Sequence, residues 1–185
     1  GEYSKVKYEN DSKDDEKKML KFNIKRKGYM NRIREYGDID IDENMRPLIL
    51  NDEFTSQDII KIMPSKMTSS QEALVYAAMK QLNRITLSRL MEKIQDSDSQ
   101  QKWNLLNIFE YLKNMNLFSE NFVPYNELIQ PKMCSIINLK GIEPEVQEII
   151  VFKMLKDLFE QRKKGKVAPF FCLLEEAHNF IPERS

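Results

Sequence analysis

Glycine is scarce in this 185-residue sequence, with five residues in all, and none of them belongs to a phosphate-binding motif. No two glycines are spaced as G-x-G-x-x-G, and none begins G-x-x-x-x-G-K-S/T. Loops of this kind bind phosphate groups through backbone amides that glycine leaves accessible. The 185 residues therefore contain neither a Rossmann fingerprint nor a P-loop.

Signals for metal binding, secretion and membrane insertion are also lacking. The single histidine, His178, excludes a site with two imidazole ligands, and Cys134 and Cys172 have no zinc-ligand spacing. Both cysteines lie in apolar runs, so we expect half-buried, reduced thiols in an intracellular protein. Residues 1–18 are too polar for a signal peptide, and the most apolar stretch, 167–174, is too short to cross a bilayer. A cytoplasmic location without a membrane partner is therefore expected.

Neither sign of charge is in excess, because 29 Lys and Arg residues balance 29 Asp and Glu residues. No overall positive field therefore attracts a polyanion such as DNA. Two local basic clusters remain, and charge runs of this kind form a solvated surface more often than a DNA contact. The clusters are Lys25, Arg26 and Lys27, and Arg162, Lys163 and Lys164.

Residues 1–50 are rich in charge, since half of the first 46 residues are acidic or basic. Within them, 11–18 predicts an exposed loop, 19–24 predicts an edge strand and 39–42 predicts a surface strand or loop. We expect this region to belong to the same core as the end of the chain.

Residues 51–130 predict an all-helical block, because polar caps and prolines separate segments with apolar residues at helical spacing. Such apolar stripes usually pack on one another, and Trp103 is expected to anchor that core. The expected helices are 55–63 (cap Thr55 or Ser56, end Pro64), 69–94 (capping box Ser69-Ser70-Gln71-Glu72, break near Thr86) and 103–116.

Residues 131–185 predict a strand–helix–strand unit. Residues 133–139 form an Ile-rich apolar run typical of a buried strand, and Pro144 suits the first position of the helix that follows. Gly165 caps that helix, and 168–174 predicts a second buried strand. A crossover of this length joins parallel strands by a right-handed connection. The expected fold is α/β with a helical insertion.

Two adjacent carboxylates, Glu175 and Glu176, directly follow the second apolar run. Ligands bind at the carboxyl ends of strands in open parallel sheets, and a buried charge needs a metal or hydrogen-bond donors. Phosphoryl-transfer enzymes use one acid near Mg²⁺ and another to orient and deprotonate the attacking water. The pattern is therefore typical of a Walker B motif. The alternative is a solvent-exposed helix start, where acids suit the helix dipole.

The residues on both sides of this acidic pair resemble a motif of a known protein family. Residues 170–182, Phe-Phe-Cys-Leu-Leu-Glu-Glu-Ala-His-Asn-Phe-Ile-Pro, resemble the Walker B segment of the HerA branch of the HerA–FtsK ATPases. Residues 135–155 are similar to the strand, turn and helix before that motif, and Gly1-Glu2-Tyr3 resembles the end of the family's second-strand motif. The resemblance implies a RecA/FtsK-like P-loop NTPase core with a helical insertion, in a hexameric, ATP-driven DNA translocase or helicase. Archaeal relatives work with a partner nuclease on DNA ends.

Carried over by position, the resemblance implies that Glu175 is the Mg²⁺-associated acid and Glu176 the general base of ATP hydrolysis. His178 and Asn179 match the motif without an assigned role, and a lone histidine is more often a structural hydrogen-bonding residue. The family's P-loop would precede Gly1. We therefore expect the chain to be part of a longer protein that binds ATP, Mg²⁺ and double-stranded DNA, and to be inactive alone.

Two other interpretations stay open. In the first, the helical block docks a partner protein and the acidic pair is structural, so that the chain is a non-catalytic interaction module. In the second, the ATPase family is the same but its cargo is DNA in conjugation or secretion. The upstream sequence separates the first interpretation from the enzyme, because a P-loop there supports the enzyme.

Overall fold

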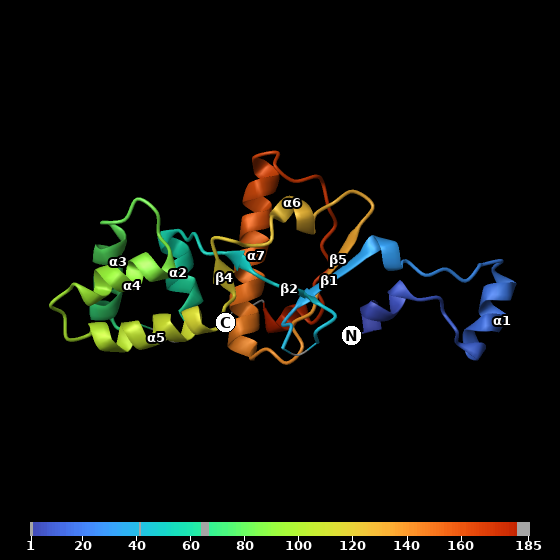
Figure 1. Ribbon diagram of the computed structural model, residues 1–185, viewed down its shortest axis with the longest axis horizontal. Coiled ribbons are helices and arrows are strands. Elements are labelled where there is room, and N and C mark those ends of the chain that lie inside the picture. The colour runs from blue at the N-terminus through green and yellow to red at the C-terminus, as the bar shows by residue number, and fades with distance from the viewer. Residues whose placement is uncertain (1, 41, 64–66, 181–185) are drawn as a thin grey trace.

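The computed structural model describes residues 2–40, 42–63 and 67–180. A three-stranded parallel sheet lies near its centre, with the strand order β2–β1–β5 (Figure 1). Ile33 pairs with Cys134 across β1 and β5, and Tyr36 pairs with Arg46 across β1 and β2. The strands are β1 (Ile33–Gly37), β2 (Arg46–Pro47) and β5 (Cys134–Ile137). Parallel strands with helices between them confirm the expected α/β class.

Residues 2–32, which we call the N-terminal arm, project from one end of the molecule (Figure 1). The arm contains η1 (Glu2–Lys7), α1 (Lys13–Lys21) and η2 (Met30–Arg32), of which η1 and η2 are 3-10 helices. The expected loop at 11–18 and the expected edge strand at 19–24 are therefore wrong. Ser12 caps α1, acids occupy its first turn and lysines its last, and this arrangement stabilises a helix.

Four helices form the helical block, and threonine caps define where three of them begin. Thr55 and Thr68 each form a capping box with the residue three positions later, and Thr86 caps the next helix. The first expected helix is confirmed. The second is two separate helices, and its capping box begins one residue earlier than expected. The helices are α2 (Ser56–Ile62), α3 (Ser69–Met79), α4 (Leu87–Gln95) and α5 (Lys102–Asn114).

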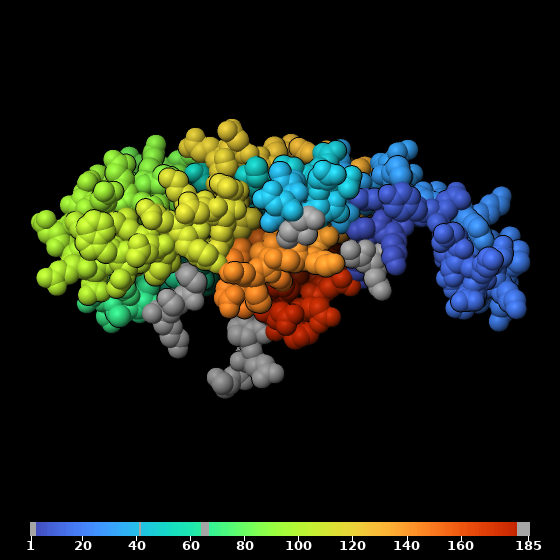
Figure 2. Space-filling model, turned by 60° about the horizontal axis from the view of Figure 1, so that its bottom comes forward, coloured from blue at the N-terminus to red at the C-terminus, as the bar shows by residue number. Residues whose placement is uncertain are grey.

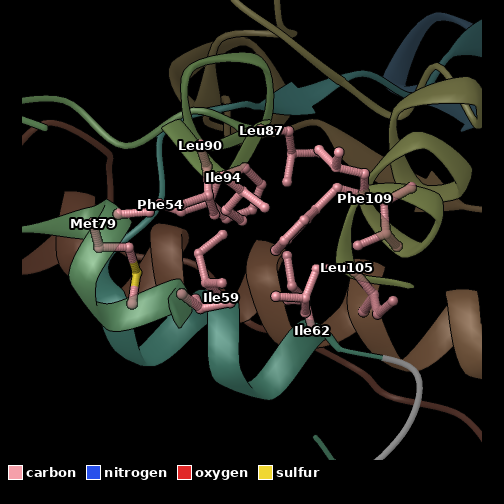
Figure 3. Close-up of a cluster of buried hydrophobic side chains, with 14 residues drawn as sticks. Phe54, Ile59, Ile62, Met79, Leu87, Leu90, Ile94, Leu105 and Phe109 are labelled. Atoms are coloured by element: carbon pink, nitrogen blue, oxygen red, sulfur yellow. The ribbon is translucent and has the colours of Figure 1, made fainter. Parts of the chain in front are cut away.

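One apolar cluster holds the helical block together (Figure 3). Ile59, Leu90 and Phe109, from three different helices, are completely buried in it, and each such side chain contributes about 1.5–3 kcal/mol. The buried positions of α5 recur every three or four residues from Leu105 onward. Trp103 lies two positions before this stripe and is 63% exposed, so its expected core role is wrong.

The long helix α7 (Pro144–Lys163) packs in two apolar clusters. Ile149 belongs to the cluster of the helical block, whereas Ile150 packs with Tyr36 of β1 in the second cluster. Pro144 lies in its first turn, and Gly165 follows it in the left-handed conformation, with φ 70°. The expected helix, its start at Pro144 and its cap at Gly165 are therefore confirmed.

The expected second strand at 168–174 is not formed. A strand needs hydrogen bonds to a neighbouring strand, and none of the strands in the described ranges pairs with this segment, where Phe171 is 89% exposed. β5 is an edge strand and only half-buried, whereas a buried strand was expected. Cys134 lies on the edge strand β5, and Cys172 lies in the unpaired segment 168–174. Both cysteines are exposed, so the expectation that they are half-buried is wrong.

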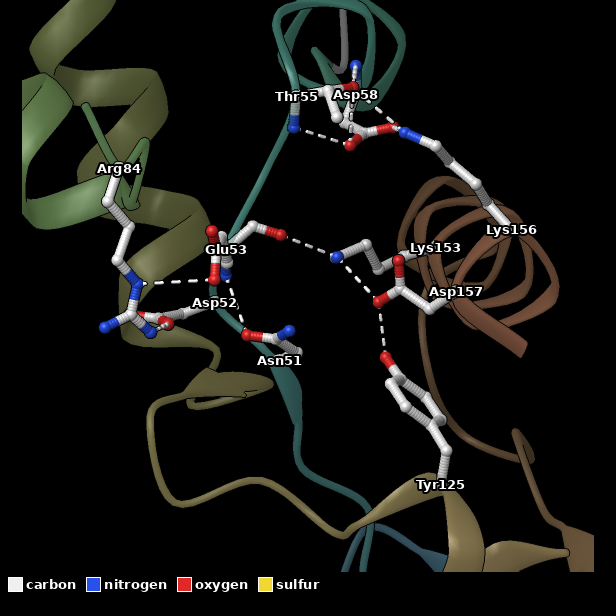
Figure 4. A network of polar contacts seen from close by, with 10 residues as sticks. All are labelled: Asn51, Asp52, Glu53, Thr55, Asp58, Arg84, Tyr125, Lys153, Lys156 and Asp157. Atoms are coloured by element: carbon white, nitrogen blue, oxygen red, sulfur yellow. Dashed lines mark hydrogen bonds and ion pairs between the residues drawn. The ribbon is translucent and has the colours of Figure 1, made fainter. Parts of the chain in front are cut away.

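A neck joins the helical block to the rest of the chain through two short parallel strands, β3 (Leu50–Asn51) and β4 (Phe118–Ser119). The Arg84 guanidinium lies 3.7 Å from the Asp52 carboxylate and 3.4 Å from that of Glu53 (Figure 4). It also lies 3.2 Å from the Glu120 carboxylate. It therefore contacts the residues that follow both strands. From α7, the Lys153 ammonium donates a hydrogen bond of 2.7 Å to the Glu53 carbonyl.

Lys153 is a buried cation with a buried network around it. Its side chain is 1% exposed and lies 2.7 Å from the Asp157 carboxylate, one helical turn later. Asp157 also accepts a hydrogen bond from the hydroxyl of Tyr125, the first residue of α6 (Tyr125–Leu128). Burial and the contact with Asp157 raise the pKa of Tyr125, so this hydroxyl remains a donor. The network joins α6, α7 and the neck.

A second carboxylate, Asp58, connects α2 to α7. It accepts hydrogen bonds from the Thr55 amide (2.7 Å) and hydroxyl (2.8 Å), and it pairs with Lys156 of α7. Burial by itself raises the pKa of Asp58, but the hydrogen bonds from Lys156 and Thr55 outweigh burial and hold the pKa below its usual range. The ionised form of Asp58 therefore stabilises the fold.

We expect the contribution of Asp58 to depend on pH. Its pKa is lower in the folded state, so the stabilisation is complete above the unfolded value of about 4 and is lost as pH falls through the folded value. Asp58→Asn should lower the free energy of unfolding at pH 7, and the difference from the unchanged chain should shrink at acid pH. Urea denaturation at a series of pH values measures this. Asp98→Asn, at an exposed position, is the control, and a difference independent of pH would contradict the expectation.

Candidate active site

After α7 the chain returns toward the carboxyl end of the sheet. The Arg162 guanidinium donates to the Val167 carbonyl at 3.3 Å, and the segment beyond reaches the 3-10 helix η3 (Ala177–Asn179). Figures 1 and 2 both place η3 close to the first turns of α7. Only residues 138–143 separate β5 from α7, so η3 lies on the side of the molecule where β5 ends. Ligands of open parallel sheets bind at this edge.

Glu175 and Glu176 form the turn before η3, and both side chains are exposed. Glu176 has φ 49° and ψ 39°, a left-handed conformation that costs a non-glycine residue about 1–2 kcal/mol. Its carboxylate lies 3.5 Å from Nδ1 of His178, and an exposed contact of this kind contributes little to stability. No other ion pair engages the two acids within the described ranges. Both carboxylates are therefore available to a ligand.

The acidic pair is suited to a hydrated metal that another group holds. In the part of the chain that the structure describes, no three His, Cys, Asp or Glu side chains come close enough to form a metal site. Mg²⁺ bound to nucleotide phosphates keeps several waters and needs only one or two protein carboxylates. Glu175 fits a contact with that water shell, and Glu176 fits the acceptance of a proton from water.

The residues of the N-terminal motif lie in the arm. Gly1 is outside the described residues, whereas Glu2 and Tyr3 begin η1. Asn179, at the other end of the chain, belongs to η3. The two motif segments are thus placed on short 3-10 helices from opposite ends of the sequence.

Glu35 on β1 is a buried carboxylate that the sequence analysis did not identify. It accepts hydrogen bonds from the Ser4 hydroxyl at 2.7 Å, from Lys7 at 2.8 Å and from the Asn138 amide at 3.1 Å. Burial raises the pKa of Glu35, but the three donors outweigh burial and lower it. The ionised Glu35 therefore holds η1 against β1 and the end of β5. An acid inside the short strand Ile33–Gly37 is the sequence signal for such a role.

The two basic clusters are not brought together. Residues 25–27 lie in the arm, and residues 162–164 lie at the end of α7, away from the acidic pair (Figure 1). Arg26 pairs with Glu16 at 3.2 Å, and Lys163 pairs with Glu160 at 3.3 Å. Both clusters are thus partly engaged in local contacts.

A hollow of about 430 Å³ lies at the base of the arm. Its lining combines three cations and two tyrosines with one acid, Glu9, and only Lys27 belongs to a predicted basic cluster. Lys27 lies 5.3 Å from the ring centre of Tyr29. The other two cations that line the hollow are Lys7 and Arg32, and the other tyrosine is Tyr8. The sequence signal is the interleaving of basic and aromatic residues, which is typical of surfaces that bind nucleic acids.

Comparison with protein-family models, with curated proteins and with solved structures finds no match for this chain. The described part of the chain contains no helix of the length and apolar character needed to span a membrane.

Proposed function

We propose that this chain is part of the ATPase core of a DNA translocase or helicase of HerA type, and that it contributes the acidic side of the ATP site. The observation that carries the proposal is the pair Glu175 and Glu176. The pair follows β5 and α7 in the chain, lies on the side of the molecule where β5 ends, and makes no ion pair within the described residues other than that of Glu176 with His178.

Glu175 would contact the water shell of Mg²⁺ on the nucleotide phosphates, and Glu176 would orient and deprotonate the attacking water. The left-handed backbone of Glu176 supports this assignment, because strained backbone conformations cluster at functional sites. His178, 3.5 Å from Glu176, would help to orient that carboxylate. The P-loop amides and lysine that bind the phosphates would come from residues outside these 185.

The exposed apolar segment before the acids also supports the proposal. Phe171 and Leu173 face solvent in a segment without regular secondary structure, whereas strands of parallel sheets are normally covered on both faces. A RecA/FtsK-like core would add neighbouring strands beside this segment and β5. The assembled enzyme would be a hexamer that acts on double-stranded DNA in the cytoplasm, with a nuclease as its partner.

A second candidate function is supported by the surface of the helical block. Trp103, Tyr76 and Tyr111 are large exposed side chains on α3 and α5, and tyrosine and tryptophan are enriched at protein interfaces. In this case the block is a protein-interaction module and the acidic pair has no catalytic role.

ATP hydrolysis by the full-length protein, measured with and without double-stranded DNA, tests the first proposal. We expect hydrolysis that DNA stimulates, and no hydrolysis above background by the 185-residue chain alone, because the chain lacks a P-loop. A full-length protein that hydrolyses no ATP would contradict the proposal and favour the interaction module. Turnover by the 185-residue chain that Glu176→Gln abolishes would show that the phosphates are bound without a P-loop.

A further inference from the structure

The tip of the N-terminal arm exposes apolar side chains that a stable protein would normally cover. Leu20, Phe22 and Ile24 are 77%, 65% and 59% exposed, and α1 has no buried residue. A helix of this length is marginal in water without tertiary packing. The arm therefore requires a surface to pack on, and it does not find one within the described part of its own chain.

The arm also carries an excess of positive charge. Residues 2–32 contain ten basic and six acidic residues, a net charge of +4, so the rest of this neutral chain carries −4. Lys17 and Lys25 are exposed, and neither has a carboxylate partner among the residues described. The contact between Arg26 and Glu16 holds the turn after α1 against that helix. Glu16 and Arg26, the sequence neighbours of Lys17 and Lys25, therefore lie together at the tip.

The matching surface is the acidic loop between β1 and β2, formed by the described residues 38–40 and 42–43. Its four acids have no basic partner within the described ranges, and Ile39 among them is exposed. Residues 39–40 and 43–44 form turns, in agreement with the loop expected there, although residue 41 lies outside the described residues. The Asp40 amide donates to the Asp38 carboxylate at 2.9 Å and stabilises the first turn. The acids are Asp38, Asp40, Asp42 and Glu43.

The tip of the arm does not reach the acidic loop of its own chain. Figures 1 and 2 show α1 at the far end of the arm, away from the loop beside the sheet. The base of the arm is held in place, because Lys7 pairs with Glu35 at 2.8 Å and the Tyr29 amide donates to the Val6 carbonyl at 3.1 Å. A Cβ on Gly28 would lie 2.7 Å from the Lys7 carbonyl oxygen, so the two segments of the base are closely packed.

We propose that the N-terminal arm of one copy of this chain docks on the acidic loop of a second copy. Lys17 and Lys25 face the carboxylates of Asp40 and Glu43, and the apolar tip of the arm covers Ile39. The two surfaces differ, so the contact is head-to-tail and builds a ring or a filament. The contact needs neither nucleotide nor DNA, and it does not rest on the proposed ATPase activity. If the contact does not form when nucleotide and DNA are both absent, the ATPase proposal is not affected.

Sedimentation velocity of the 185-residue chain tests the contact. We expect concentration-dependent self-association at about 50 mM salt that weakens at about 500 mM, because salt screens exposed charges. Lys17→Glu/Lys25→Glu on the arm, or Asp40→Lys/Glu43→Lys on the loop, should each raise the dissociation constant at least about tenfold. None of these four side chains makes an ion pair in the described structure. Circular dichroism shows whether each variant remains folded.

Mixing the two variants gives the decisive measurement. The arm of the first variant is then negatively charged and the loop of the second is positively charged. The mixture should therefore associate, although each variant alone does not. Lys80→Glu/Lys113→Glu, two exposed lysines of the helical block, changes the net charge equally and should leave association unchanged. A monomeric chain at all concentrations, or a mixture that does not associate, overturns the inference. So does an arm variant that loses binding to an oligonucleotide but still self-associates.

Discussion

Glu176→Gln in the full-length protein is expected to lower DNA-stimulated ATP hydrolysis by about 10²- to 10⁴-fold, the usual contribution of a general base. Glutamine has nearly the same size and can still hydrogen-bond a water, but it cannot accept its proton. Glu176 is exposed, and among the described residues its carboxylate pairs with His178 alone, at 3.5 Å, so the substitution should not destabilise the fold. ATP binding should remain, since the phosphates would be bound elsewhere.

Two matched substitutions make this measurement specific. Glu175→Gln should weaken the binding of Mg²⁺, so that a higher Mg²⁺ concentration restores part of the rate, whereas no Mg²⁺ concentration should restore Glu176→Gln. His178→Ala removes the 3.5 Å contact and should lower the rate by less than about tenfold. Steady-state ATP hydrolysis against Mg²⁺ concentration distinguishes the three. Equal rates for Glu176→Gln and the unchanged protein would remove Glu176 from the mechanism.

Asp157→Ala is expected to lower the free energy of unfolding by about 3–5 kcal/mol, because it leaves the buried Lys153 ammonium without its counter-charge. The side chains of Lys153 and Asp157 are 1% and 15% exposed, so the unpaired Lys153 ammonium would have little access to water. The same substitution removes the acceptor of the Tyr125 hydroxyl. The Glu53 carbonyl, 2.7 Å from the Lys153 ammonium, and the Phe54 ring, whose centre is 5.0 Å from it, would remain as neutral partners.

The double variant Lys153→Met/Asp157→Asn should be more stable than Asp157→Ala, although it changes more residues. Methionine fills the volume of the lysine without a charge, and the asparagine oxygen can still accept from Tyr125. Lys163→Met, at an exposed ion pair with Glu160, is the control and should change stability by less than about 1 kcal/mol. Urea denaturation measures all three. A double variant as unstable as Asp157→Ala would show that the buried charge is not the cause.

Helices defined by neighbouring residues were predictable from the sequence. The start of α7 follows from Pro144, its end from Gly165, and the start of α2 from the capping box of Thr55 and Asp58. Hydrogen bonds within one turn and fixed backbone preferences determine these features, and they depend little on the rest of the fold. The acidic pair after an apolar run was equally visible, since its members are adjacent in the chain.

Burial could not be predicted in the same way. Trp103, Phe171 and Cys134 were expected to be covered because they are apolar or lie in apolar runs, yet all three are exposed. Whether an apolar side chain is covered depends on a second segment, and the 168–174 segment has no paired strand within the described residues. The edge-strand prediction at 19–24 failed because charges at the two ends of α1 favoured a helix.

The starts of α2 and α7, the α/β class and the position of the two adjacent carboxylates were predictable without the structure, because each depends on residues close together in the chain. The packing of distant segments brings Glu35 to donors from η1 and from Asn138 after β5, buries Lys153 against the neck and keeps the basic clusters apart. These features join residues far apart in sequence, so they exist only once β1, β5 and α7 are packed together.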